Sequence, residues 1–174
     1  SSDSDLKFYN EAFNRQVKDV ETEIWAHTCW GNPNQQSFYW ERPSYERALD
    51  YFLDMKCDVI DLECASNQAR DAALFKNVDL KKYGKKIGIG VVDHTRTTVE
   101  SPEMVAETIR RALEFIPEDR LVITADCGFG REGLSRRIAY YKCVSLVLGT
   151  NIVRSELGLE EKYVAASDDL YSFS

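Results

Sequence analysis

The sequence lacks the features that mark membrane, secreted and nucleic-acid-binding proteins. No apolar run approaches the roughly 20 residues that a membrane-spanning helix needs. The first residues, Ser-Ser-Asp-Ser-Asp, contain neither a basic start nor an apolar stretch, so we expect no secretion signal and a cytoplasmic location. Because the net charge is −7 and the basic residues are scattered, we expect no binding of nucleic acid.

A disulfide framework is also not expected, because the cysteines are odd in number and no secretory signal accompanies them. Five cysteines occur in 174 residues, and metal binding or simple burial explains them better. The composition, with 44% hydrophobic and 29% charged residues, is ordinary for a globular protein. The length is sufficient for one domain with a hydrophobic core, so we treat residues 1–174 as a single domain.

What the sequence does contain is an alternation of expected strands and helices. Strands are expected at residues 23–29, 57–63, 86–92 and 120–125. A short helix at residues 8–17 precedes them, and helices follow from Ser44, over residues 68–75, from Pro102 and from about Leu134. In the last helix we expect four apolar side chains to face inward, namely Ile138, Val144, Leu148 and Ile152.

Four strand-then-helix units imply parallel strands joined by right-handed crossovers. The candidate reactive residues fall at or just beyond the C-terminal ends of the expected strands, as they do in a (β/α)8 or TIM barrel. Four units make half of such a barrel. We therefore predict an α/β fold in which residues 1–20 form a preceding helix, residues 21–158 form the last four β/α units and residues 159–174 form a tail. The missing N-terminal barrel half would be a partner of this chain.

His27, Cys29, Glu63 and Cys127 have the residue types and the placement of a zinc site. His27 and Cys29 are two positions apart, so an extended strand directs both side chains to the same face. Glu63 and Cys127 follow the second and the fourth expected strand. Zn²⁺ takes nitrogen, sulfur and oxygen ligands in a tetrahedral arrangement. The three other cysteines, Cys57, Cys64 and Cys143, are interpreted as ordinary packing residues.

Two further features occur at strand ends. Asp93 and His94 follow the third strand, and His94 is either a general acid or base or a hydrogen-bonded rim residue. The segment 128–133, Gly-Phe-Gly-Arg-Glu-Gly, matches the dinucleotide-binding fingerprint, but no second strand with an acidic residue follows it. We therefore expect these glycines to let the backbone turn tightly beneath the metal instead of holding a nucleotide.

Four motifs in this order resemble the C-terminal catalytic domain of cobalamin-independent methionine synthase. They read His-Thr-Cys-Trp-Gly-Asn-Pro from residue 27, Asp-Val-Ile-Asp-Leu-Glu from residue 58, Gly-Ile-Gly-Val-Val-Asp from residue 88 and Asp-Cys-Gly-Phe-Gly-Arg-Glu-Gly from residue 126. The resemblance extends from about residue 20 to about residue 158. It implies the last four strands of a TIM barrel, with zinc bound by His27, Cys29, Glu63 and Cys127.

The resemblance also implies the chemistry of a methyltransferase. Zinc lowers the pKa of a substrate thiol, so that a thiolate exists at neutral pH. In the family, homocysteine thiolate then attacks the methyl group of a methylfolate, and a histidine near the third strand end protonates the folate leaving group. In this sequence His94 directly follows Asp93, whereas the longer synthases have Asp-x-His, so His94 points differently.

Two other interpretations stay open at this point. Relatives with similar zinc motifs include the epoxyalkane:coenzyme M transferases, in which a thiolate opens an epoxide. The chain could also be an inactive half-barrel fragment, because half a barrel has two open sheet edges that must be covered. The small-molecule partners are a thiol and a methyl donor or another electrophile, and the sequence leaves homo-oligomer formation open.

Overall fold

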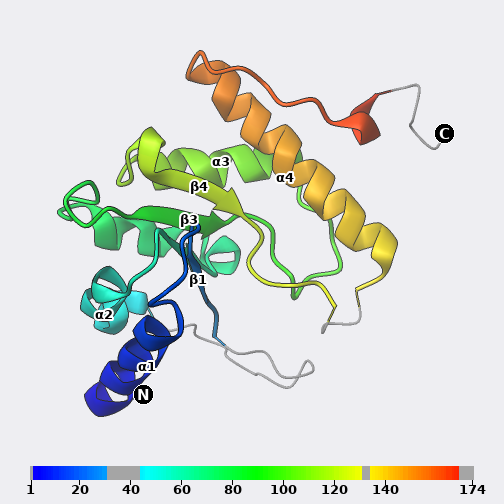
Figure 1. Cartoon of the computed structure of the whole chain (residues 1–174). Coiled ribbons are helices and arrows are strands. Elements are labelled where there is room, and N and C mark those ends of the chain that lie inside the picture. Colours follow the sequence, from blue (N-terminus) through cyan, green and yellow to red (C-terminus); the bar gives the residue numbers. More distant parts are fainter. Residues whose placement is uncertain (1, 31–43, 131–133, 169–174) are drawn as a thin grey trace.

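The computed structural model describes residues 2–30, 44–130 and 134–168. Its strands are β1 (Trp25–Thr28), β2 (Val59–Leu62), β3 (Lys86–Gly90) and β4 (Leu121–Thr124). They form one parallel sheet in the order β1-β2-β3-β4 (Figure 1). The expected parallel α/β arrangement is therefore confirmed, although the strands are shorter than expected at one or both ends.

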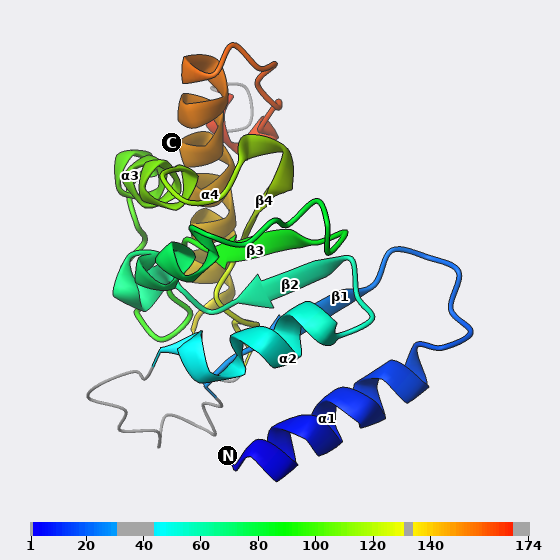
Figure 2. The ribbon, with the colours of Figure 1, turned by 90° about the vertical axis from the view of Figure 1, so that its left-hand side faces the viewer.

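Helices connect the strands and pack around the sheet (Figure 2). The α-helices are α1 (Asp3–Gln16), α2 (Leu49–Asp54), α3 (Pro102–Leu113) and α4 (Arg136–Glu156). Short 3-10 segments lie at η1 (Tyr45–Ala48), η2 (Ala65–Asn67), η3 (Arg70–Phe75), η4 (Glu118–Arg120) and η5 (Ala165–Ser167). Helix α3 begins as predicted, because the Ser101 hydroxyl accepts the N–H of Met104 and Pro102 is the first helical residue. Within the described ranges, no helix is long and apolar enough to cross a membrane.

The two faces of the sheet differ in character. Alternate residues of a strand point to opposite faces. One face carries the core, where Ile60, Leu62, Ile87 and Ile89 are fully buried. The opposite face carries His27 of β1, which lies in register beside Asp61 of β2 and Gly88 of β3. The strands therefore separate an apolar face from a face on which polar chemistry can take place.

The helix expected over residues 68–75 ends at Phe75 as expected, but it starts at Arg70 and not at Gln68. Gln68 and Ala69 have φ angles of 54° and 59°, in the left-handed region that interrupts a right-handed helix. The helical segment therefore begins at Arg70, whose N–H donates to Asn67 Oδ1 at 3.2 Å. It is a 3-10 helix, η3, and not an α-helix.

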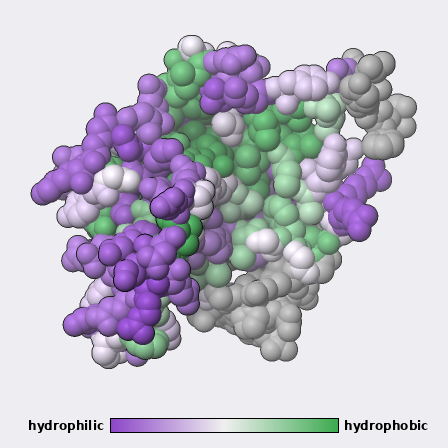
Figure 3. All heavy atoms as spheres, viewed as in Figure 1, coloured by the Kyte–Doolittle hydropathy of each residue, from purple (hydrophilic) through white to green (hydrophobic). Residues whose placement is uncertain are grey.

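The inward face predicted for the last helix is confirmed only in part, because Ile152 packs against the core but is not fully buried. The four predicted side chains of α4 are only half-buried, whereas Lys142, Ser145, Gly149 and Val153 are buried. Gly149 allows α4 to approach α3 closely, because a Cβ at this position would lie 2.5 Å from the Pro102 carbonyl oxygen and from Val105. Apolar side chains of α4 thus remain partly exposed, and Figure 3 shows a hydrophobic surface over α4 and β4.

We expect Gly149→Leu to destabilise the protein, because the new side chain cannot fit between α4 and α3. Overpacking of this kind costs about 1–3 kcal/mol, more than the roughly 1 kcal/mol that replacing a helical glycine returns. Urea unfolding measures the difference. Ser155→Leu, at an exposed position of the same helix, is the matched control and should change the free energy of unfolding by less than about 0.5 kcal/mol. Equal effects of the two substitutions would contradict the close contact.

Candidate metal centre

Three of the four predicted zinc ligands lie together at the C-terminal ends of the strands. Possible ligand atoms of His27, Cys29 and Cys127 all lie within 4.8 Å of one another. His27 belongs to β1, Cys29 follows that strand on the same face, and Cys127 follows β4. His27 and Cys29 are exposed and Cys127 is half-buried, so solvent and small molecules reach this group.

Glu63, the fourth predicted ligand, belongs to a second group directly beside the first. Ligand atoms of Glu63, His94 and Asp126 lie within 4.8 Å of one another, and all three residues are buried. The Trp30 N–H donates to Glu63 Oε2 at 3.0 Å. The Glu63 N–H donates to the carbonyl oxygen of Thr28, the residue between His27 and Cys29, at 3.3 Å, so Glu63 lies beside the strand that carries the first group.

The environment raises the pKa values of two of the predicted ligands, His27 and Cys127. A hydrogen bond to Asp61 raises the pKa of His27. Burial raises the pKa of the Cys127 thiol, and the neighbouring Cys29 raises it further. Without a metal, both effects favour the protonated forms, and a cation would have to displace these protons.

The remaining cysteines belong to neither group, and the packing role predicted for them holds for Cys57 and Cys64 but not for Cys143. Cys57 and Cys64 are buried, and burial raises the pKa of both thiols. Cys143 is exposed on α4. None of the five cysteines forms a disulfide in the structure.

Asp126 joins the end of β4 to the end of β2. Its Oδ1 accepts the N–H groups of Cys64 at 2.8 Å and Ala65 at 2.7 Å, which holds the turn that follows Glu63. Burial raises the pKa of Asp126 to about 8, although these two N–H groups act in the opposite direction. Gly90 leaves room for the carboxylate, because a Cβ there would lie 2.0 Å from Asp126 Oδ1.

Asp93 is used within its own loop. Its Oδ1 accepts the N–H and the hydroxyl of Thr95, at 2.8 and 2.6 Å, and its Oδ2 lies 3.3 Å from Arg96 Nε. Its own N–H donates to Glu100 Oε1 at 2.9 Å. Of the predicted catalytic pair, therefore, His94 and not Asp93 lies with Glu63 and Asp126.

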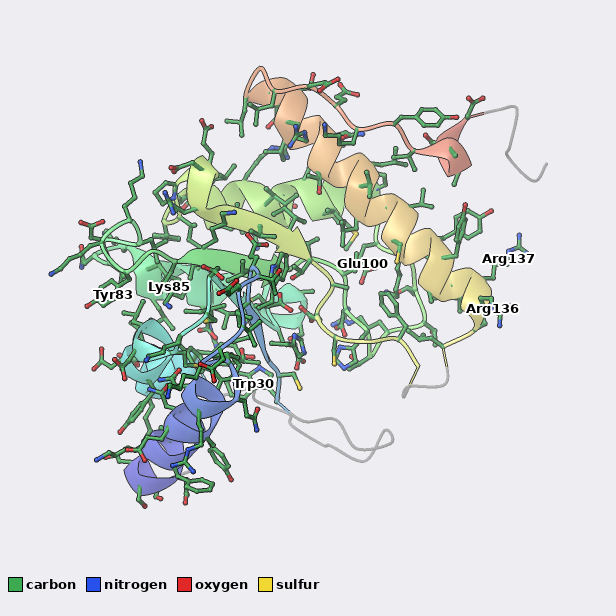
Figure 4. The ribbon with its side chains drawn as sticks, viewed as in Figure 1. Trp30, Tyr83, Lys85, Glu100, Arg136 and Arg137 are labelled. Carbon is green, nitrogen blue, oxygen red and sulfur yellow. The ribbon has the colours of Figure 1, made fainter. Side chains whose placement is uncertain are left out.

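A buried ion pair anchors this loop to α4. Lys142 Nζ lies 2.7 Å from Glu100 Oε2 and also donates to the Thr98 carbonyl oxygen at 2.7 Å. The Lys142 side chain is fully buried. In Figure 4, Glu100 and Trp30 lie toward the end of the sheet to which the strands point, and Lys85 lies toward the opposite end. The ion pair thus fixes the loop at the end of the sheet where the candidate ligands lie.

The role expected for the glycine-rich segment is not supported. At Gly128 and Gly130 an added Cβ would meet nothing within 4 Å, and neither residue has a positive φ. These two positions therefore do not require glycine for a tight turn. Residues 131–133, the rest of the motif, lie outside the described residues.

The sequence patterns did not identify two residues of the site. They did not single out Asp61, and they assigned no bridging role to Asp126. Both carboxylates occupy space that glycines of β3 leave open, because added Cβ atoms at Gly88 and Gly90 would collide with Asp61 and Asp126, respectively. One signal in the sequence could have revealed them. Gly88 and Gly90 stand at alternate positions of the third expected strand, and the second expected strand carries Asp61 two residues before Glu63.

Known proteins share this arrangement of sequence and fold. The family model of the cobalamin-independent synthase catalytic domain matches residues 7–143. A methionine synthase of Thermococcus kodakarensis is 41% identical over 152 residues, which cover 87% of this chain and 40% of that protein. A methionine synthase of Saccharolobus solfataricus is 37% identical over 155 residues, which cover 88% of this chain and 41% of that protein.

The fold of this chain also matches that of a solved methionine synthase structure. The B12-independent methionine synthase from Shewanella sp. W3-18-1, in complex with selenomethionine, matches with a TM-score of 0.75 and 26% sequence identity. The match covers 88% of this chain and 45% of that chain. The chain thus spans less than half the length of each of these relatives.

The raised pKa of Asp126 predicts a pH dependence of stability in the zinc-free protein. The pKa is about 8 in the folded state and has an ordinary value of 3.8, so between these values the folded state binds more protons than the unfolded state. The contribution of Asp126 to stability is therefore present at about pH 4 and is lost as the pH rises toward 8. Asp126→Asn, which mimics the protonated side chain, should remove this loss. Urea unfolding of both proteins across this range measures it, and parallel curves would contradict the assignment.

Proposed function

Because the chain belongs to the family of cobalamin-independent synthase catalytic domains, we propose that it is the zinc-binding part of a methyltransferase. The reaction transfers a methyl group from a methylfolate-type donor to the thiol of homocysteine. The observation that carries this proposal is the convergence of His27, Cys29 and Cys127 at the strand ends. An imidazole and two thiols in mutual reach form a donor set that suits zinc.

The spacing of these donors fits a zinc ion. Tetrahedral ligands at about 2.0–2.3 Å from zinc are separated from one another by roughly 3.3–3.8 Å. The upper limit of 4.8 Å within the group leaves only a small adjustment to that geometry. We propose Glu63 as the fourth protein ligand, because its charge already acts on His27 and Cys127. Zinc, when bound, lowers the pKa of a substrate thiol and so supplies a nucleophile at neutral pH.

The buried side chains beside these donors suit the handling of protons. His94 lies with Glu63 and Asp126 in a site from which water is largely excluded. We assign His94 as the acid that protonates the leaving group of the methyl donor. Asp93 acts with it by fixing the backbone of their loop, since its carboxylate is engaged by Thr95 and Arg96.

The chain is proposed to be the C-terminal half of a (β/α)8 barrel. Within the described residues, β1 and β4 each pair with one strand only. The N-terminal half would cover these two edges and the half-exposed apolar side chains of α4. The cavity beside Asp93, of about 230 Å³, is lined by neither the four proposed ligands nor His94, so we propose that the N-terminal half would contribute to the substrate pocket. The cytoplasmic location and the oligomeric state stay predictions.

Removal of one thiol tests the metal centre. We expect Cys127→Ser to abolish tight zinc binding, because a hydroxyl replaces a thiolate ligand. Metal analysis together with the intact mass of the same sample gives the zinc content per chain. Cys143→Ser is the matched control, since Cys143 is exposed on α4 and away from the group. If Cys127→Ser retained the wild-type zinc content, the proposed centre would be wrong.

The reaction is tested with the chain joined to, or co-expressed with, its upstream barrel half. We expect formation of methionine from homocysteine and a methylfolate, measured by mass spectrometry, and its loss in the Cys127→Ser variant. Consumption of an epoxide with a thiol, in place of methyl transfer, would instead identify an epoxide:thiol transferase. A zinc-loaded complex that alkylates no thiol with either electrophile would contradict an enzymatic role.

A further inference from the structure

We propose that Asp61 is a positioning residue that fixes the ring of His27 for metal binding. The inference rests on the proposed metal centre, but it concerns a residue outside the four proposed ligands. Asp61 lies directly opposite His27 in the register of β1 and β2. His27 Nδ1 and Asp61 Oδ2 are 2.7 Å apart, the distance of a strong hydrogen bond.

The Asp61 carboxylate is itself held in one orientation. While Oδ2 contacts His27, Oδ1 accepts the hydroxyl of Thr124 in β4 at 2.6 Å. The carboxylate therefore reaches across β3, which lies between β2 and β4 in the sheet. Gly88 makes this passage possible, because a Cβ there would lie 2.8 Å from Asp61 Oδ1. The Asp61 side chain is only 13% exposed, so water competes little for these bonds.

This arrangement determines which nitrogen of His27 is available to a metal. A carboxylate accepts hydrogen bonds, so the Nδ1 that faces Asp61 carries the proton. Nε2 is then the nitrogen whose lone pair can bind a cation. A carboxylate behind a metal-binding histidine also makes the ring a better donor, and loss of such a partner typically weakens metal binding about 10–100-fold.

Asp61 is distinct from the other acidic groups near the site. Glu63, on the same face of the same segment, is directed toward the Trp30 N–H, and Asp126 toward the N–H groups of Cys64 and Ala65. Of these three carboxylates, Asp61 is the one hydrogen-bonded to His27. Its effect on metal binding should therefore pass through the histidine ring.

Zinc affinity of the full chain, measured by competition with a chromogenic chelator, is the first test. We expect Asp61→Asn to weaken zinc binding about 10–100-fold. Thr124→Val, which releases only the far side of the carboxylate, should give a smaller loss in the same direction. Asp58→Asn is the matched control, because Asp58 accepts the Ile24 N–H at the opposite end of β2 and should leave zinc affinity unchanged.

The tautomer of His27 is the second readout, and a merely structural role of Asp61 would not change it. The chain has only two histidines, so ¹⁵N NMR of the zinc-free protein resolves both, with His27→Gln for assignment. At a pH high enough for the His27 ring to be neutral, we expect the Nδ1–H form in the wild type and a mixture of tautomers in Asp61→Asn.

Each outcome bears on a different claim. Wild-type zinc affinity in Asp61→Asn, or a wild-type His27 protonated at Nε2, would overturn the inference about Asp61. Weaker zinc binding with an unchanged tautomer would also overturn it, since Asp61 would then act on the fold alone. Failure of the wild type to bind zinc would sink the proposed metal centre, whereas the NMR measurement would still decide whether Asp61 orients His27.

Discussion

The site is built around two glycines of β3, Gly88 and Gly90, which have no side chains to fill the space above the strand. Gly88 and Gly90 leave open the space that the carboxylates of Asp61 and Asp126 occupy. Asp61 uses this space to contact His27 on one side and Thr124 on the other. Asp126 uses it to hold the backbone that follows Glu63. Side chains from three strands are thus brought into one site because the strand between them carries no side chains of its own at these positions.

Helix α4 supports the same end of the sheet in a second way. Three of its buried residues serve the neighbouring elements: Gly149 meets α3, and Lys142 and Ser145 bond to Glu100 of the loop that carries Asp93 and His94. The Lys142–Glu100 ion pair is shielded from water, and burial of charges is costly unless the geometry is good. Lys142 meets this condition, because it also donates to a backbone carbonyl and Glu100 also accepts the Asp93 N–H. Apolar side chains of α4 remain partly exposed, and these are the ones that the proposed N-terminal barrel half would cover.

Local sequence patterns predicted the elements whose signals are themselves local. Pro102 predicted the start of α3 because the first turn of a helix tolerates proline, and the Ser101 hydroxyl caps that turn in the structure. The start predicted at Gln68 was wrong because Gln68 and Ala69 adopt left-handed φ angles, which no periodicity reveals. The inward face of α4 was predicted only in part, for a tertiary reason. Apolar spacing indicates which side chains prefer burial, but the close contact at Gly149 decides which face of the helix packs on α3.

Sequence patterns alone were enough to predict the parallel α/β class and the family, and they singled out the residues proposed to bind a metal. Two-residue spacing on a strand places His27 and Cys29 on one face wherever that strand lies, and the ends of parallel strands meet at one edge. The packing of the strands determines how the candidate residues are distributed between the two groups. It placed Glu63 with His94 and Asp126, and it gave His27 a carboxylate partner in Asp61. Such pairings join residues far apart in the chain, and the register of the strands and the space above Gly88 and Gly90 select them.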